Sequence, residues 1–256
     1  MPEHPTTVPE APLGDRGSRP WAPGPQRPLL ADGAVHVWCA DLGRVTQELC
    51  SLLSKQERER AQRILGARER RMWERSHAVL RELLGRYQPL HPARLRFTLD
   101  AHGKPRLLPA GRDHRAATRG TPSVRPASAA AGIHFNMSHS GATALYAIAS
   151  GVAVGVDVEA RTHGRLDELS IAARAIGPAT ARRLRTLTGD SRTRAFLRAW
   201  TREEAELKCL GTGIWAEAPR APRALWGTEL LCGPGVAGAL ALQSAPRELR
   251  CWEWAA

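Results

Sequence analysis

The sequence predicts an α/β protein made of two similar halves. Segments with the apolar patterns of strands alternate with segments of helical periodicity, and this succession occurs twice along the chain. The chain has 256 residues, of which 43% are hydrophobic, so it can bury a sizeable core. Two similar halves explain the double succession better than one continuous sheet does.

The expected division of the chain follows from its composition. Residues 1–28 contain eight prolines and almost no β-branched or aromatic residues, so they should form a disordered tail, with order beginning near Leu29. Residues 29–150 are expected to form an N-terminal half and residues 151–256 a C-terminal half. Within the first half, residues 109–132 are rich in Pro, Gly, Ser, Ala and Arg without any period, which indicates a mobile insertion.

The N-terminal half should begin with a strand over residues 34–40. Ser54 and Glu57 have the spacing of a capping box, which predicts the start of a helix. Gly66 should interrupt that helix, and a second helix with one apolar face should follow and end at Gly85.

Strands are expected in the middle of the chain and at its end. The middle strands are predicted over residues 95–99, 133–137, 142–149 and 152–159. Residues 138–141 should form a tight loop between two of them, and Ser150-Gly151 a hairpin turn. In the C-terminal half we expect a helical region over 167–187 broken at Gly177-Pro178, a helix over 192–210 ended by Gly211, and strands near 224–232, 236–243 and 247–254.

Charge and cysteine usage restrict the class of partner and the compartment. With 37 Lys and Arg against 25 Asp and Glu, the formal net charge is +12, which favours an anionic partner. Charge alone would favour nucleic acid, but the closely spaced Phe and Tyr residues of RNA-binding surfaces are missing. The five cysteines form no CxxC pair, and no apolar run is long enough to span a membrane or to act as a secretory signal. We therefore expect a soluble, cytoplasmic protein without a disulfide framework or a zinc site.

Asp157 and Glu159 lie two residues apart at the end of an apolar strand. Side chains two apart on a strand point to the same face, so the two carboxylates should project together. Burial and mutual repulsion make such a pair costly, and Mg²⁺ binds carboxylates of this kind together with water and phosphate oxygens. The alternative is a solvated pair just beyond the end of the strand.

A second candidate group lies on the helix expected over residues 192–210. Trp200, Glu204 and Lys208 follow each other at intervals of four and share one face. A glutamate on a cation and a lysine on phosphate would hold a metal–diphosphate unit. The alternatives are an exposed Glu204–Lys208 ion pair and a capping box formed by Thr201 and Glu204.

Two further motifs are weaker when taken alone. Ser138, His139 and Ser140 fall in the expected loop, where hydroxyl, imidazole and backbone N–H groups would bind phosphate. A serine hydrolase is a poorer interpretation because G-x-S-x-G is absent and a histidine cannot normally act as the base for an adjacent serine; a structural histidine is the other alternative. The run His102-Gly103-Lys104-Pro105 indicates a turn, which needs no function.

The four motifs together resemble those of a known family. HGKP, FNxSHSG, GxDxE and WTxxEAxxKxxGxG occur in this order, and the chain resembles the 4′-phosphopantetheinyl transferase superfamily, specifically its monomeric Sfp-like branch, over roughly residues 50–214. The resemblance implies an α/β (α+β) fold of two pseudo-symmetric halves, each a small, mostly antiparallel sheet packed with a long helix. It also implies an enzyme of the holo-[acyl-carrier-protein] synthase type.

The implied reaction moves the 4′-phosphopantetheine group from coenzyme A to a serine of an apo acyl or peptidyl carrier protein and releases 3′,5′-ADP. Asp157, Glu159 and Glu204 would bind Mg²⁺, and Glu204 would also be the candidate base. The resemblance implies further that the partners are coenzyme A and acidic carrier proteins, which the basic surface would attract, and that neither nucleic acid nor a membrane is bound.

The resemblance assigns the remaining site residues to coenzyme A. Lys208 and His139 would hold its diphosphate and act in catalysis, with Ser138 beside them. Lys104 and Pro105 would border the adenine. One arginine of a basic helical run would bind the 3′-phosphate, and Arg71 is the best candidate.

Two features depart from the family pattern and leave alternatives open. Family members usually have lysine directly before the metal-binding glutamate, whereas this chain has Glu203. The insertion over residues 109–132 falls just before the phosphate-binding motif. A degenerate relative without activity, a basic nucleic-acid-binding protein and a hydrolase of coenzyme A are the alternative functions, although the presence of every expected carboxylate argues against loss of activity.

Overall fold

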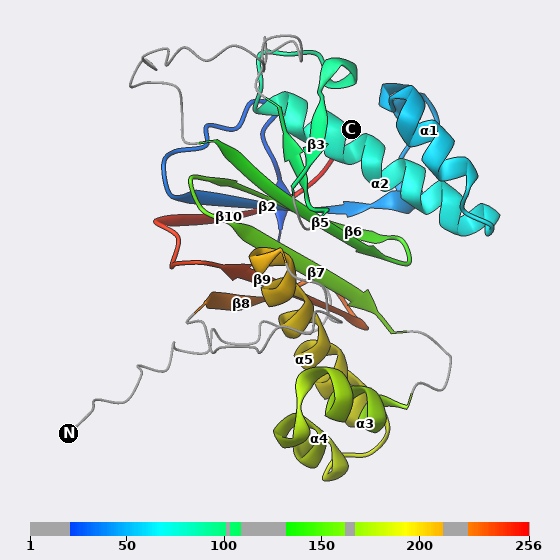
Figure 1. Ribbon diagram of the computed structural model, residues 1–256, viewed down its shortest axis with the longest axis vertical. Coiled ribbons are helices and arrows are strands. Elements are labelled where there is room, and N and C mark those ends of the chain that lie inside the picture. Colours follow the sequence, from blue (N-terminus) through cyan, green and yellow to red (C-terminus); the bar gives the residue numbers. More distant parts are fainter. Residues whose placement is uncertain (1–20, 101–102, 109–131, 162–166, 212–224, 256) are drawn as a thin grey trace.

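The structure is a computed structural model that describes residues 21–100, 103–108, 132–161, 167–211 and 225–255. Its strands form two sheets and a short hairpin, and a long helix lies on the outer side of each sheet (Figure 1). None of the helices in these ranges is both long and apolar enough to cross a membrane.

The first sheet has five strands in the order β1-β10-β2-β6-β5. Their bounds are Ala22–Pro23 for β1, Glu248–Glu253 for β10, Ala34–Asp41 for β2, Thr143–Ser150 for β6 and Ile133–Ser140 for β5. β10 runs parallel to both of its neighbours, whereas β2, β6 and β5 are antiparallel.

The second sheet has three antiparallel strands in the order β7-β9-β8. Their bounds are Val154–Ala160 for β7, Val236–Leu242 for β9 and Trp226–Leu231 for β8. A separate hairpin consists of β3 (Phe97–Leu99) and β4 (Pro105–Leu107).

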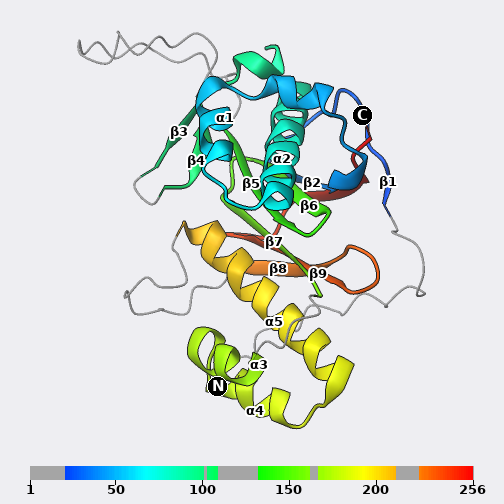
Figure 2. The same cartoon turned by 90° about the vertical axis from the view of Figure 1, so that its right-hand side faces the viewer.

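The helices are divided between the two halves. The first half contains η1 (Leu42–Arg44), η2 (Glu48–Leu52), α1 (Lys55–Gln62), α2 (Ala67–Arg86) and η3 (Pro92–Arg94). The second half contains α3 (Glu168–Ile171), the π-helical turn η5 (Ala172–Ile176), α4 (Pro178–Arg185) and α5 (Gly189–Leu210). In Figure 2, α2 lies over the first sheet and α5 runs along the second sheet.

Three of the apolar clusters among the described residues join the sheets and the long helices. Val35 and Val37 of β2 belong to a cluster that the two sheets share, whereas Trp38, the next residue, belongs to the cluster between the first sheet and α2. Central strands buried on both faces are apolar at consecutive positions, as β2 and β6 are. On the second sheet, Ala205 of α5 packs against Ala239 of β9, and these small side chains allow the helix to approach closely.

This architecture confirms the expected fold class of small sheets packed with long helices. The predicted capping box is formed, since the Ser54 hydroxyl accepts from the Glu57 N–H and the Glu57 carboxylate accepts from the Ser54 N–H. The predicted helix break at Gly177 and the helix end at Gly211, which has a φ of 74°, are confirmed as well.

Three expectations about the order of the chain are wrong. Residues 21–28 are not part of a disordered tail, because Trp21 is buried and β1 pairs with β10. Ser150-Gly151 does not join a hairpin, because β7 pairs with β9 in the other sheet. The expected boundary at residue 150 also does not separate the two sheets, because β10, from the expected C-terminal half, belongs to the first sheet. The remaining tail and residues 109–131 of the expected insertion lie outside the described residues.

Candidate active site

The two sheets meet along β5 and β7, and side chains of β5 cross this seam. Three hydrogen bonds join the strands at successive positions. They run from the Val156 N–H to Asn136 Oδ1 at 2.8 Å, from Ser138 Oγ to Asp157 Oδ1 at 2.7 Å and from Ser140 Oγ to Glu159 Oε2 at 2.8 Å. The partners advance together along both strands, so β5 and β7 lie side by side and point in the same direction.

Asp157 is buried within β7, with only 3% of its surface exposed. Its Oδ1 accepts from Ser138 and also from Lys208 Nζ of α5, at 2.6 Å. Its Oδ2 is buried and has no hydrogen-bond partner among the described residues. Because a buried charged oxygen without a partner is costly, a cation at this atom would stabilise the folded protein.

Glu159 and Glu204 lie close to Asp157 and are half-buried. Burial raises the pKa of Glu159, and the negative charge of Asp157 raises it further, while hydrogen bonds from Ser140 and Trp200 oppose the rise. Burial likewise raises the pKa of Glu204, and the negative charge of Asp157 is the next largest cause of that rise. Each carboxylate is thus easier to ionise when positive charge is near.

The carboxylates do not converge on one point. Within the described ranges, no group of three or more His, Cys, Asp or Glu side chains has the spacing of metal ligands. Asp157 is engaged with Ser138 and Lys208, and Glu159 is engaged with Ser140. The magnesium ligand set predicted from the sequence therefore stays a prediction.

Lys208 of α5 and His139 of β5 lie near each other. Lys208 Nζ contacts Ser138 Oγ at 3.0 Å as well as Asp157, and its side chain is 28% exposed. Burial lowers the pKa of His139, and the nearby Lys208 ammonium lowers it further. A neutral imidazole next to an ammonium is suited to an anionic group such as phosphate.

Gly155 brings β7 and α5 into backbone contact. A Cβ at this position would overlap the Ala205 carbonyl oxygen and the Cys209 backbone nitrogen, and would lie 3.0 Å from the Cys209 Cα. Only glycine fits between the strand and the helix. This close crossing brings Asp157, two residues further along β7, within reach of Lys208.

Lys104 reaches the same crossing from the β3–β4 hairpin. Gly103, with a φ of 79°, forms the predicted turn, and Pro105 begins β4; His102 lies outside the described residues. Lys104 Nζ donates to the carbonyl oxygens of Val154 at 2.8 Å and Lys208 at 2.6 Å. The ammonium is therefore engaged with backbone, which was not expected of a residue assigned to bind adenine.

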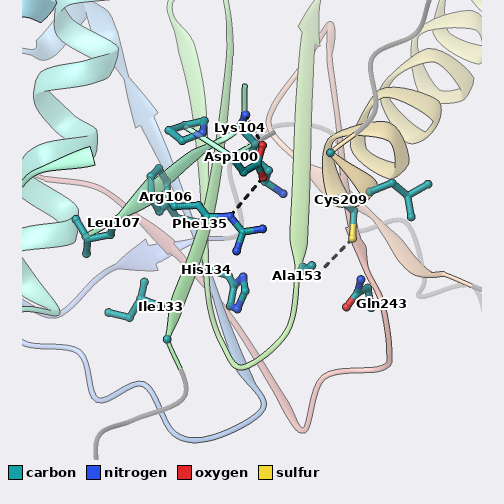
Figure 3. A pocket seen from close by; sticks show the side chains of 14 residues that line it. Asp100, Lys104, Arg106, Leu107, Ile133, His134, Phe135, Ala153, Cys209 and Gln243 are labelled. Carbon is teal, nitrogen blue, oxygen red and sulfur yellow. Dashed lines mark hydrogen bonds and ion pairs between the residues drawn. The ribbon is translucent and has the colours of Figure 1, made fainter. Parts of the chain in front are cut away.

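A pocket of about 270 Å³ opens beside this hairpin (Figure 3). The hairpin provides Lys104, Pro105 and Arg106, β5 provides His134, and α5 provides Cys209. Figure 3 shows Arg106 paired with Asp100, whose carboxylate lies 3.3 Å from the Arg106 Nε. The predicted adenine neighbours thus line a pocket, whereas Ser138 and His139 are not among the described residues that line it.

Arg71 lies on the exposed surface of α2 and does not line the pocket. Arg75, one turn further, donates to the Leu42 carbonyl oxygen at 2.9 Å and so has a structural partner. The structure therefore does not single out one arginine of α2 for a phosphate.

The chain is similar in sequence to known 4′-phosphopantetheinyl transferases. The model of the 4′-phosphopantetheinyl transferase superfamily matches residues 153–226, which include β7 and α5. HetI, a 4′-phosphopantetheinyl transferase of Nostoc sp. (strain PCC 7120 / SAG 25.82 / UTEX 2576), is 31% identical over 197 residues, which are 76% of this chain and 76% of HetI. The chain belongs to the 4′-phosphopantetheinyl transferase superfamily.

A second relative of this superfamily matches a smaller part of the chain. The protein slr0495 of Synechocystis sp. (strain ATCC 27184 / PCC 6803 / Kazusa), a candidate 4′-phosphopantetheinyl transferase, is 30% identical over 164 residues. The match spans 64% of this chain and 59% of slr0495. The matches support phosphopantetheine transfer as the general activity of this 4′-phosphopantetheinyl transferase family member.

The structure corrects three local interpretations. Ser138, His139 and Ser140 lie in β5, not in a loop, and their strand pairs with β6, so the segment is not a phosphate-binding nest of backbone N–H groups. Asp157 and Glu159 lie inside β7, so they are not a solvated pair beyond its end. α5 begins at Gly189, which excludes a capping box at Thr201.

Sequence reasoning missed the pairing partners of the acidic strand. Asn136, Ser138 and Ser140 alternate along β5, and alternation on a strand places side chains on one face. This polar face next to an acidic one was a usable signal. Arg106 and His134 of the pocket carried no comparable signal, because they are isolated basic residues in a chain rich in them.

Proposed function

We propose that this protein transfers the 4′-phosphopantetheine group from coenzyme A to a serine of an apo acyl or peptidyl carrier protein, with Mg²⁺, as a holo-[acyl-carrier-protein] synthase type enzyme. The buried Asp157 carboxylate supports this most strongly. It lies at the seam with Lys208 on one oxygen and no described partner on the other. The family membership supports the same chemistry.

The candidate carboxylates offer the oxygen ligands that Mg²⁺ prefers, and their side chains would have to turn toward one another to share the ion, because they are not gathered in the part of the chain that the structure describes. Asp157 Oδ2 is buried and lacks a described partner, and burial together with like charge raises the pKa of Glu159 and Glu204. Asp157, Glu159 and Glu204 would hold the metal. When bound, Mg²⁺ would neutralise charge on the diphosphate of coenzyme A.

Glu204 is suited to take the proton of the carrier serine, directly or through water. In the proposed step, the serine oxygen forms a bond to the β-phosphorus of coenzyme A, the bond to the bridging oxygen breaks, and 3′,5′-ADP leaves. Burial and Asp157 raise the pKa of Glu204, which makes it a stronger base than an ordinary carboxylate. Most of the catalysis would come from positioning and charge stabilisation.

Lys208 and His139 would hold the diphosphate. The Lys208 ammonium is partly exposed, so it can face a phosphate while it contacts Asp157 and Ser138. The pocket at the β3–β4 hairpin would receive the nucleoside end, with Pro105 beside the adenine. Arg71 on α2 stays the candidate for the 3′-phosphate, and Arg106 in the pocket is a second one.

The net charge of the chain and the origin of all candidate site residues in one chain support an acidic carrier protein as partner and a monomeric enzyme. The net charge of +12 would attract an acidic carrier protein and speed its association. A single chain contains every candidate site residue from both halves, so a monomer suffices, in keeping with the Sfp-like branch. Coenzyme A and carrier proteins would then be met in the cytoplasm.

The proposal is tested with coenzyme A, Mg²⁺ and a panel of apo carrier proteins, scored by intact mass. We expect at least one carrier to gain the phosphopantetheine mass. Asp157→Asn and Glu204→Gln should each lower the rate about 100-fold or more, while Glu59→Gln on the exposed face of α1 should not. Absence of any mass gain with wild-type protein would contradict the transfer reaction, and release of free 4′-phosphopantetheine and 3′,5′-ADP without carrier would indicate a hydrolase.

A further inference from the structure

Lys104 connects the two elements that carry the candidate site. Its ammonium donates to the carbonyl oxygen of Val154, the first residue of β7, and to that of Lys208, in the last turn of α5. Lys104 itself belongs to the other half of the molecule, directly before β4. Three segments that are far apart in sequence therefore meet at one nitrogen atom.

We propose that Lys104 is a positioning residue whose ammonium fixes the spacing between β7 and α5, and with it the arrangement of Asp157 and Lys208, rather than a residue that binds coenzyme A through its charge. This inference rests on the proposed function of the Asp157 site. It assigns Lys104 a role different from the contact with adenine that the sequence motif implies.

One bond of Lys104 goes to the C-terminal end of α5, where carbonyl groups lack partners within the helix. The last four carbonyl groups of a helix have no partner within the helix, and Lys208 contributes one of them in α5. A cation at this end also interacts favourably with the helix dipole. An ammonium has three donors, and two of these are directed at β7 and α5 at hydrogen-bond distance.

Gly155 provides a second, independent observation at the same crossing. It follows Val154 in β7, and its Cα faces the Ala205 carbonyl and Cys209 backbone with no space for a side chain. The glycine lets the two backbones touch, and Lys104 holds the residues on either side of that contact. The backbone contact at Gly155 prevents β7 and α5 from coming closer, and the two hydrogen bonds of Lys104 resist their separation.

The choice of lysine supports a geometric role. The sequence has lysine only at Lys55, Lys104 and Lys208, and arginine supplies the other basic side chains among a total of 37. Lys55 is exposed on α1, whereas the other two meet at the site. A compact ammonium can approach two carbonyl oxygens from one point, whereas the wide, planar guanidinium of arginine needs more room.

The test compares Lys104→Met with the matched control Lys55→Met, in the full-length protein. Hydrogen exchange of the α5 amides near Cys209 and thermal unfolding are measured without ligands. Transfer kinetics then give the KM for coenzyme A and the Mg²⁺ concentration for half-maximal rate. For Lys104→Met we expect faster hydrogen exchange at the end of α5 and a midpoint of thermal unfolding lower by about 4–8 °C. The Mg²⁺ concentration for half-maximal rate should rise several-fold, whereas the KM for coenzyme A should stay almost unchanged. Lys55→Met should match the wild type in all four measurements.

Two results would overturn the inference. One is a KM for coenzyme A that rises about 10-fold or more while exchange and Mg²⁺ requirement stay at wild-type values, since this would mean direct contact with the ligand. The other is a Lys104→Arg variant with full activity and wild-type exchange, since any cation would then serve. Failure of wild-type protein to transfer phosphopantetheine would refute the proposed function instead, and the exchange and unfolding measurements would still decide whether Lys104 holds the crossing.

Discussion

Gly155→Ala should separate β7 from α5, and the structure indicates how far. The new Cβ would overlap the Ala205 carbonyl oxygen and the Cys209 nitrogen, whereas ordinary contacts lie at 3.4–4 Å. Backbone atoms cannot rotate away as a side chain can, so strand and helix would have to move apart by on the order of 1 Å. Overpacking of this kind costs about 3 kcal/mol at its upper end, which corresponds to a melting temperature lower by about 6–12 °C.

The effect on activity should exceed the effect on stability. Movement of β7 carries Asp157 away from Lys208, and a misplacement of about 1 Å costs about 100-fold in rate. Differential scanning fluorimetry and carrier-protein mass assays below the melting temperature measure the two effects separately. Gly227→Ala in β8 is the matched control, because its Cβ would lie 3.3 Å from the Leu240 carbonyl oxygen. Equal melting temperatures and equal rates for the two variants would refute the reasoning.

Two further predictions concern buried polar groups. Burial lowers the pKa of His36 to about 4, so the unfolded chain takes up a proton below about pH 6.5 that the folded protein does not, and up to about 3 kcal/mol of stability should be lost as the pH falls from about 6.5 to about 4. Denaturation by urea at both ends of this range should show a smaller loss for His36→Phe, and identical losses would contradict the assignment. Arg81→Met should destabilise the protein by about 3–5 kcal/mol, because it removes the cation paired with the half-buried Glu57 carboxylate and the donor to the carbonyl groups of Pro92 and Leu95. The control is Arg68→Met on the exposed surface of α2. If Arg81→Met shifted the midpoint of urea denaturation no more than Arg68→Met does, the structural role of Arg81 would be contradicted.

Local chemistry allowed much of the fold to be predicted. The capping box at Ser54, the break at Gly177 and the helix end at Gly211 each depend on a few neighbouring residues, and each was found where its pattern predicted. The acidic pair on β7 was placed on one strand face by its spacing alone. The identity of the family came from the order of four short motifs, since each motif alone had a plausible structural explanation.

Partners that are distant in sequence were not predictable in this way. No pattern in residues 248–253 indicates that β10 lies between β1 and β2, because the choice of neighbour depends on the packing of the whole sheet. Ser138 to Ser140 were predicted as part of a tight loop between two strands, whereas they extend β5 and the hydroxyls of Ser138 and Ser140 donate to carboxylates of β7. The bonds of Lys104 join residues that are 50 and 104 positions apart, and a turn motif carries no information about them.

The place of β10 in the first sheet affects the order in which this protein can fold during synthesis. β10 lies between β1 and β2 and pairs with both. Because β10 is near the C-terminal end of the chain, β1 and β2 emerge from the ribosome long before it does. Until then the edge of β2 is open to other chains, which exposes the nascent polypeptide to aggregation. Completion of the first sheet must therefore follow translation of the second, and the two halves are expected to acquire their stability together rather than one after the other.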